Sequence, residues 1–299
     1  MNEFFAADPA SCENSADLRF LLANFGPHAG RYLAYYPSTW AEVIKRRCDE
    51  LGPLEGERAK TLIRRAHESA VLLRKSALPW DERSPWIDNY RSVTRARPGE
   101  FEKGIVPRKV TGDDVVTIDD LELSPTADES IEAIAKEYVR VSRTLLLLSP
   151  ELVFVDPYLN PCKNDRQDVL SEMLATAVKG KCRVVTIWAR DSNIVGDRQN
   201  SWDEVQAAVR KILRSARWPE DRRFSFVLVD DATCRSKMHP RYLLSIKGGI
   251  RFDQGFQRLS KARRNDVSPL GKALHGEVLE IYHEGRHDME IVRRLDVGK

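Results

Sequence analysis

The chain has 299 residues, of which 42% are hydrophobic and 31% charged, with 48 Lys and Arg against 45 Asp and Glu. This length allows roughly two domains, and the composition excludes a disordered or fibrous protein. The net charge of only +3 gives no global indication of a nucleic-acid partner, so local basic clusters have to supply one.

Cysteine usage and hydropathy bear on where the protein works. No apolar run approaches the roughly 20 residues that span a bilayer. The acidic N-terminus lacks a basic segment, which predicts no signal peptide. The scattered cysteines form no C-x-x-C pair, which predicts reduced thiols in a cytoplasm and no structural zinc: Cys12, Cys48, Cys162, Cys182 and Cys234. We therefore expect a cytoplasmic protein without a membrane span, metal or cofactor.

The first third of the chain has the pattern of a helical region. Residues from about 15 to 93 are read as successive helices, one of them opened by a capping box at Thr39–Glu42. We expect residues 1–110 to form a helical region that binds substrate or a partner. Three aromatic residues near turn signals are expected to pack at a domain interface rather than to stack on bases: Trp80, Trp86 and Tyr90.

A polar stretch from Pro98 to about Pro125 is the predicted linker, and its segment DVVTIDDLEL holds a short strand or two. After it, Thr126 and Glu129 fit a second capping box, which predicts that an amphipathic helix begins there. The second domain is therefore expected to cover residues 126–299.

Strands and helices alternate along this second domain. The predicted strands are ELVFVD (151–156), CRVVTIWAR (182–190) and RFSFVLV (223–229), and the predicted helices between them cover 165–179 and 201–217. Such alternation predicts right-handed crossovers and a largely parallel α/β sheet covered on both faces. A hairpin with strands at 241–245 and 250–253 follows, turning at Gly248 and Gly249, and 277–283 is the last predicted strand.

The segment KMHPRYLLSIKGGIRFDQGF, which contains this hairpin, carries the most informative residues. His239 and Arg241 are two positions apart, so on a strand their side chains point to the same face. An imidazole beside a fixed guanidinium suits a phosphate group, because arginine grips phosphate oxygens through paired N–H groups. We therefore expect a phosphate site, although a histidine at a strand edge that only bonds backbone is the plainer interpretation.

The order strand–DPYL–helix–strand–helix–strand–H-x-R–hairpin–Gly resembles the phospholipase D-like superfamily over roughly residues 126–299. The resemblance implies an α/β/α sandwich around a mixed sheet, preceded here by the α-helical N-terminal domain. It implies that a histidine attacks phosphorus, that a neighbouring cation holds the non-bridging oxygens, and that no metal takes part. It further implies that two such motifs meet at one site, from two repeats or two subunits.

Position by position, His239 matches the nucleophile of that family and Arg241 takes the place of its lysine. Ile246 stands where the family has aspartate, and Gly255 is followed by Phe256 rather than serine. One interpretation is a metal-independent phosphodiesterase, specifically a nuclease. The other is a catalytically lapsed module that binds nucleic acid or a phosphorylated ligand within a larger complex, for example in antiviral defence. A third is a structural protein whose aromatic N-terminal region docks a partner.

The resemblance requires a second histidine to protonate the leaving oxygen, and no second H-x-K or H-x-R exists in the chain. The simplest source is His239 of a second copy, which predicts a homodimer. Within the chain, His275 oriented by Glu277 is the alternative.

Further residues are expected to contact substrate. Asp156 ends the first strand of the domain, where α/β sheets collect ligands, although an Asp-Pro pair also caps turns. A basic run after the hairpin is placed where a polyanion passes, with a solvated face as the plainer interpretation: Arg258, Lys261, Arg263 and Arg264. His283 and His287 have spacing that mimics a metal site, but Gly285 between them favours a turn.

Overall fold

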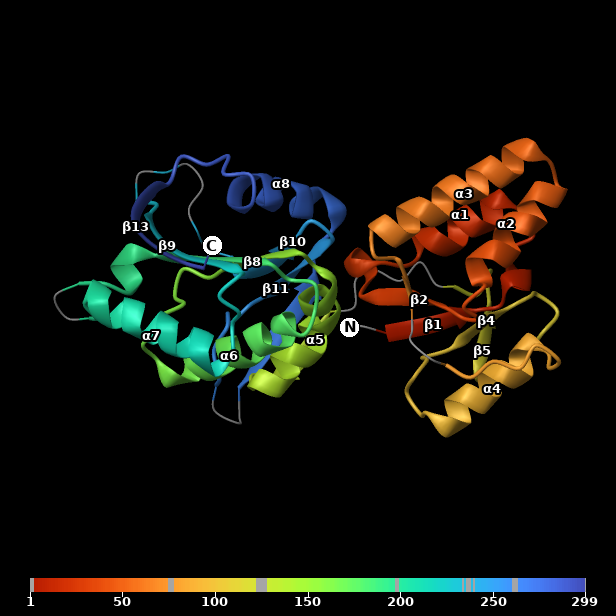
Figure 1. Ribbon diagram of the computed structural model, residues 1–299, viewed down its shortest axis with the longest axis horizontal. Coiled ribbons are helices and arrows are strands. Elements are labelled where there is room, and N and C mark those ends of the chain that lie inside the picture. Colours follow the sequence, from red (N-terminus) through yellow and green to blue (C-terminus); the bar gives the residue numbers. More distant parts are fainter. Residues whose placement is uncertain are drawn as a thin grey trace. The chain divides into compact units, whose positions relative to one another are not determined.

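The computed structural model shows a mixed α/β protein whose chain divides into two compact units, Met1–Ala127 and Asp128–Lys299, here called the N-terminal and C-terminal units (Figure 1). Each unit contains its own sheet. The structure describes residues 3–74, 78–121, 128–196, 199–232, 234, 238, 240–259 and 263–298.

The N-terminal unit is built on a five-stranded parallel sheet of order β3-β2-β1-β4-β5. Its strands are β1 (Glu3–Ala7), β2 (Arg31–Tyr35), β3 (Leu72–Arg74), β4 (Gly104–Val106) and β5 (Val115–Thr117). The expected all-helical region is therefore wrong. These strands are short and mostly buried, so they lack the alternating pattern of a half-exposed strand and resemble buried helix in sequence.

Helices cover both faces of this sheet: α1 (Ser15–Ala23), α2 (Trp40–Glu50) and α3 (Pro53–Glu68) on one face, and α4 (Trp86–Ala96) on the other (Figure 1). Helix α2 begins where the sequence predicts, but Thr39 makes no side-chain cap bond. Trp86 stacks on Tyr90 with ring centroids 5.3 Å apart. Both rings belong to the core of this unit, so the expectation of domain-interface packing is wrong for them.

The C-terminal unit is built on an eight-stranded mixed sheet of order β13-β9-β8-β7-β10-β11-β12-β6. Strands β7, β8 and β9 run parallel, and the other pairings are antiparallel. The bounds are β6 (Glu129–Glu132), β7 (Glu151–Val155), β8 (Val184–Arg190), β9 (Arg223–Asp230), β10 (Tyr242–Ser245), β11 (Gly248–Phe252), β12 (Arg264–Pro269) and β13 (Glu290–Val297).

Helices α5 (Ala135–Leu148), α6 (Asn164–Val178) and α7 (Trp202–Ser215) lie on one face of that sheet, and α8 (Lys272–Tyr282) lies on the other (Figure 1). The alternation of β7, α6, β8, α7 and β9 confirms the predicted sequence of elements from 151 to 229. Single helices between parallel strands bring the carboxyl ends of those strands to one edge of the sheet.

Three predictions in this unit are wrong. Glu129 begins strand β6 rather than a helix, while Thr126 of the expected capping box lies outside the described residues. Residues 277–283 belong to helix α8 and its C-cap rather than to a strand. Gly248 and Gly249 both lie within β11 and pair with Ser245 and Leu244 of β10, so neither is in the turn. A Cβ at Gly249 would come 2.7 Å from Leu270 Cδ1 and 2.9 Å from Leu244 Cδ2. Close packing explains this glycine.

Within the described part of the chain, no helix combines the length and the apolar character that a membrane crossing requires.

Candidate functional site

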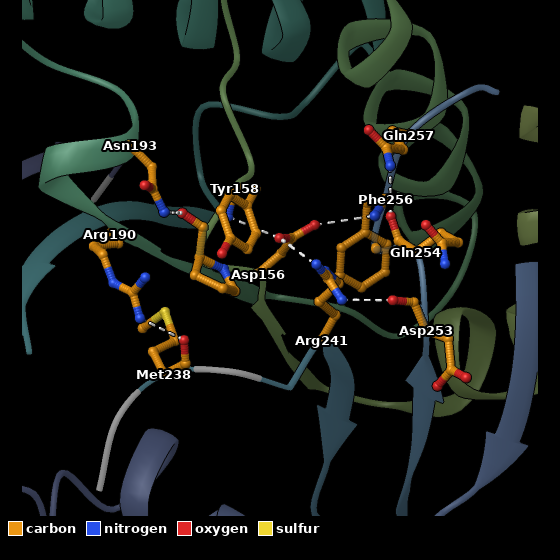
Figure 2. Close-up of polar contacts among 12 residues, drawn as sticks. Asp156, Tyr158, Arg190, Asn193, Met238, Arg241, Asp253, Gln254, Phe256 and Gln257 are labelled. Atoms are coloured by element: carbon orange, nitrogen blue, oxygen red, sulfur yellow. Dashed lines mark hydrogen bonds and ion pairs between the residues drawn. The ribbon is translucent and has the colours of Figure 1, made fainter. Parts of the chain in front are cut away.

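The pairing of β7 with β10 brings Asp156 and Arg241 together, although these residues are 85 positions apart in the sequence. Val155, the last residue of β7, lies opposite Tyr242, the first residue of β10. Asp156 and Arg241 flank this pair at the same edge of the sheet. The Arg241 Nε atom is 3.7 Å from Asp156 Oδ1, and the two side chains form an ion pair (Figure 2).

Asp156 is a buried carboxylate, with only 4% of its surface exposed. Its Oδ1 accepts a hydrogen bond from the Tyr158 amide at 2.9 Å, and its Oδ2 accepts one from the Phe256 amide at 3.1 Å. Burial raises the pKa of Asp156 above its ordinary value, and these two donors and the Arg241 charge act in the opposite direction. The carboxylate thus joins the end of β7 to the loop after β11.

Gly255 is the point at which that loop approaches Asp156. It has φ +70°, a left-handed conformation that favours glycine. A Cβ at this position would lie 2.2 Å from Asp156 Oδ2 and 2.7 Å from Arg241 Cδ. Glycine is therefore required both by its backbone conformation and by its two side-chain neighbours.

Two buried polar side chains, Tyr138 and Asn265, hold this loop through hydrogen bonds. The Tyr138 hydroxyl is 2.8 Å from the carbonyl oxygens of both Gly255 and Gln257. Asn265 Nδ2 donates to the Tyr138 hydroxyl at 2.8 Å and to the Gly255 carbonyl at 3.1 Å, and Asn265 Oδ1 accepts from the Gln254 amide at 2.8 Å. Burial raises the pKa of Tyr138 to about 12, so its hydroxyl stays protonated. These hydrogen bonds hold the loop at Gln254, Gly255 and Gln257.

Above Asp156 lies a small pocket of about 180 Å³, lined by Asp156, Tyr158, Arg166, Arg241, Gln254 and Gln257. Arg241 donates through Nη1 to the Asp253 carbonyl, and its guanidinium lies over the Tyr158 ring, 5.2 Å from the centroid. Arg166, from the first turn of α6, donates through Nη2 to Gln257 Oε1 at 2.6 Å and pairs with Asp165. Two fixed guanidinium groups beside amide side chains suit the oxygens of a phosphate.

A second ion pair lies beside the pocket. Arg190, at the end of β8, binds both carboxylate oxygens of Asp231, each at 2.7 Å. The same pair binds the backbone of Met238. The Met238 amide donates to Asp231 Oδ2 at 2.6 Å. The Met238 carbonyl accepts from Arg190 Nη2 at 2.8 Å (Figure 2). The residue before His239 is thus held on both its backbone polar groups.

Some of the predicted site residues lie within the described part of the chain, and others do not. His239 and Lys261 lie outside the described residues, whereas the neighbours of His239, Met238 and Pro240, lie inside. Asp156, Arg241 and Gly255 meet at the pocket. The pairing of an aspartate after β7 with an arginine before β10 is therefore the part of the predicted site that converges.

The within-chain candidate for a second acid lies elsewhere. His275, on α8, is buried, and its Nε2 lies 2.8 Å from the Ser245 carbonyl, at the opposite end of β10 from Arg241. Glu277 is exposed on the same helix. The structure does not bring this pair to the pocket.

The described residues of the basic run, Arg258, Arg263 and Arg264, are not among the residues that line the pocket. Arg258 pairs with Asp168 at 3.4 Å, and its amide donates to the Asp165 carbonyl at 2.9 Å, which places it beside the start of α6. Arg264 donates through Nε to Ser130 Oγ at 3.2 Å, where β12 pairs with β6. Arg263 is exposed.

The two departures from the family pattern have different positions. Ile246, where the family has aspartate, is 56% exposed in the turn between β10 and β11, at the end of β10 away from the pocket. Phe256, in place of serine, is fully buried against Phe154 and Phe252, and only its amide reaches Asp156. Neither side chain lines the pocket.

His283 and His287, whose spacing resembles that of a metal site, contact different partners. His283 Nε2 lies 2.9 Å from Glu151 Oε2, and the His287 ring packs edge-on against Trp188 with centroids 5.1 Å apart. Among the residues that the structure describes, no three His, Cys, Asp or Glu side chains gather as metal ligands.

Sequence reasoning missed most of the side chains that build the site: Tyr138, Tyr158, Arg166, Arg190, Asp231, Gln254, Gln257 and Asn265. Two signals were available in the sequence. Tyr158 belongs to the D-P-Y-L segment that carries part of the family resemblance, and Asp231 is the second residue after the predicted strand 223–229. Tyr138 and Asn265 give no such signal, because their roles depend on pairing between remote segments.

Comparison with known proteins adds only weak likeness. No protein-family model and no curated protein matches the sequence. A solved structure of TrmBL2, an archaeal chromatin protein described as showing a novel mode of DNA binding, matches with a TM-score of 0.32 and 10% identity. That match covers 84% of this chain and 70% of the other. A likeness at this level identifies neither the fold nor the function of this chain.

Proposed function

We propose that the pocket at Arg241 binds a phosphodiester, and that the protein is a phospholipase D-like phosphodiesterase that cleaves nucleic acid without a metal. The observation that carries this proposal is the convergence of Arg241 with Arg166 at a pocket walled by Asp156 and the Gly255 loop. Arg241 is two residues from His239, so the cation that grips a phosphate and the proposed nucleophile belong to one short segment. The layered mixed sheet, with an H-x-R segment leading into β10, further supports the proposed family.

In the proposed reaction, a ring nitrogen of His239 attacks phosphorus and forms a P–N bond while the bond from phosphorus to the leaving oxygen breaks. Arg241 and Arg166 stabilise the charge that develops on the non-bridging oxygens. A second histidine donates the proton that the leaving oxygen takes up. Water then attacks phosphorus, the P–N bond breaks, and the second histidine recovers a proton from that water.

The second histidine is proposed to be His239 of another copy of the chain. This proposal is supported by the position of His275, whose ring bonds the Ser245 carbonyl at the far end of β10. A two-fold dimer would place two equivalent pockets side by side, each contributing one histidine.

The alternative proposal is a binding module on the same scaffold, without turnover. It is favoured by the way Arg241 is held, with Nη1 on the Asp253 carbonyl and Nε facing Asp156, and by arginine in place of the lysine of the family. Such a module could dock nucleic acid or a phosphorylated ligand within a larger complex.

Cleavage of a labelled oligonucleotide in EDTA separates these proposals. The enzyme proposal expects the wild type to cleave, and His239→Ala and Arg241→Ala to lose cleavage. The module proposal expects no cleavage by any of them, with salt-sensitive binding that Arg241→Ala weakens. Equal cleavage by wild type and His239→Ala would refute the enzyme proposal.

A further inference from the structure

Tyr158 is an aromatic side chain at the pocket that the proposed chemistry does not use. Its ring lines the pocket, yet the residue is 46% exposed. Single exposed aromatic residues are common on protein surfaces, so what distinguishes Tyr158 is its place beside a site for a charged group.

The ring is held in place from several directions. The Tyr158 amide donates to Asp156 Oδ1 at 2.9 Å, the Arg241 guanidinium covers part of the ring, and the hydroxyl interacts with the Arg190 guanidinium. Figure 2 shows the ring standing between these two arginines. A ring fixed in this way loses little conformational entropy when a ligand packs on it.

The size of the pocket limits what it can enclose. Pockets that enclose a drug-sized ligand have volumes of roughly 300–1,000 Å³. The pocket here, at about 180 Å³, is smaller, so it suits a phosphate and its immediate atoms rather than a whole nucleotide. The base attached to that phosphate must then lie outside, where the exposed part of Tyr158 and the exposed side chain of Gln254 are.

We propose that Tyr158 is a stacking platform for an unpaired base, and that the pocket therefore selects single-stranded nucleic acid. This inference rests on the proposed phosphate site at Arg241. In a duplex, each base is stacked on its neighbours and paired, so its flat face is not accessible to a protein ring. In a single strand the face is free, and any base can stack on an aromatic side chain while arginines hold the backbone.

The test is binding, measured by fluorescence anisotropy in EDTA, with every variant made in the His239→Ala protein so that the probes stay intact. The probes are a labelled single strand, the same strand in a duplex, and the same strand with abasic sugars. Tyr158→Leu removes the ring and keeps apolar bulk, and Tyr158→Phe keeps the ring. Phe20→Leu is the matched control, because Phe20 is an exposed ring in the N-terminal unit.

We expect the single strand to bind more tightly than the duplex. Tyr158→Leu should weaken binding of the single strand by roughly 5- to 150-fold, the effect of losing one base stack. It should leave the abasic strand unaffected. Phe20→Leu should change neither, and Tyr158→Phe, which keeps the ring and loses only the hydroxyl beside Arg190, should weaken binding of the single strand less than Tyr158→Leu does. Equal weakening of the normal and abasic strands would overturn the proposal, because the ring would then only support Arg241. Equal affinity for duplex and single strand would also overturn it.

The binding assay gives a different result if the proposed phosphate site at Arg241 does not exist. If none of the probes binds in a salt-sensitive manner, and Arg241→Ala changes nothing, the phosphate site itself is absent and the stacking role is refuted with it.

Discussion

Arg190 and Asp231 form a bidentate ion pair that holds the amide and the carbonyl of one residue, Met238. Paired charges of this kind are costly to break when buried, because the remaining charge loses its partner in a region of low dielectric constant. The pair lies where the chain leads toward Arg241, and we propose that it positions the segment that carries the proposed nucleophile.

We therefore expect Asp231→Asn to lower the free energy of unfolding by about 3 kcal/mol. It should also lower kcat more than it changes KM, since the substrate still meets Arg241 and Arg166. Asp114→Asn is the matched control, because Asp114 forms the same bidentate pair with Arg91 on an exposed surface of the N-terminal unit. Its cost should be about 0.2–1 kcal/mol. Denaturant unfolding and steady-state kinetics make the comparison, and equal effects of the two variants would contradict the positioning role.

The same carboxylate gives a pH dependence. Burial raises the pKa of Asp231, but the hydrogen bonds from Arg190 and the Met238 amide outweigh burial and hold the pKa below its ordinary value. Because the folded-state pKa is lower than the unfolded value of about 3.9, the carboxylate stabilises the fold above that value and this contribution is lost as the pH falls further.

The difference in unfolding free energy between wild type and Asp231→Asn should thus be constant across neutral pH and shrink below about pH 4. Urea unfolding at a series of pH values measures it. A difference that persists unchanged in acid would show that the ionised carboxylate is not the stabilising group.

Gly255→Ala should damage both stability and binding. The backbone strain of a left-handed alanine costs about 1–2 kcal/mol, and displacing Asp156 or Arg241 from the new methyl group adds about 1–3 kcal/mol. Gly285→Ala isolates the first contribution, because Gly285 has φ +72° and no atom lies within 4 Å of the place that an alanine Cβ would take. Thermal unfolding and oligonucleotide binding of the two variants give the comparison. If Gly255→Ala is no worse than Gly285→Ala, the close approach to Asp156 is not required.

The sequence predicts the framework of the C-terminal unit better than that of the N-terminal unit, for a physical reason. Strand β7 and helices α6 and α7 have strong patterns of their own, with clear turns between them, so local sequence identifies them. Strands β1 to β5 are three to five residues long, and most of their residues are buried in a parallel sheet. Their pairing across the sheet, rather than their local pattern, determines that they are strands.

The residues of the site also differ in how readily the sequence identifies them. Arg241 and Asp156 are identifiable because each belongs to a local motif, and Gly255 because it follows a hairpin. Tyr138 and Asn265 are not, since their hydrogen bonds span segments 117 and 127 residues apart. Such contacts follow from tertiary structure alone.

Tyr138→Phe tests whether that buried pair holds the loop. Removing the hydroxyl leaves the Gly255 and Gln257 carbonyls and the Asn265 amide short of a partner, which should cost about 2–3 kcal/mol. Tyr36→Phe is the control, because its hydroxyl donates to the single carbonyl of Pro79 in the N-terminal unit. We expect about 1 kcal/mol there. Only Tyr138→Phe should weaken oligonucleotide binding. Unchanged binding would show that the loop held by Tyr138 does not contribute to binding at the pocket.

The proposed dimeric site predicts that specific activity depends on protein concentration. Dilution should lower the activity per molecule at the same concentrations at which the molecular mass falls from twice 34.2 kDa to that of one chain. Sedimentation and cleavage assays on the same dilution series measure both. Full specific activity in a monomer would contradict a histidine supplied by a second copy.

Trapping the covalent intermediate is the sharpest test of a histidine nucleophile. The wild type, mixed with a single-stranded oligonucleotide in EDTA and quenched rapidly in denaturant, is digested and mapped by mass spectrometry. We expect a phosphorus adduct on His239, and no adduct in His239→Ala. Cleavage by the wild type with His239 unmodified throughout, or an adduct on another residue, would contradict it.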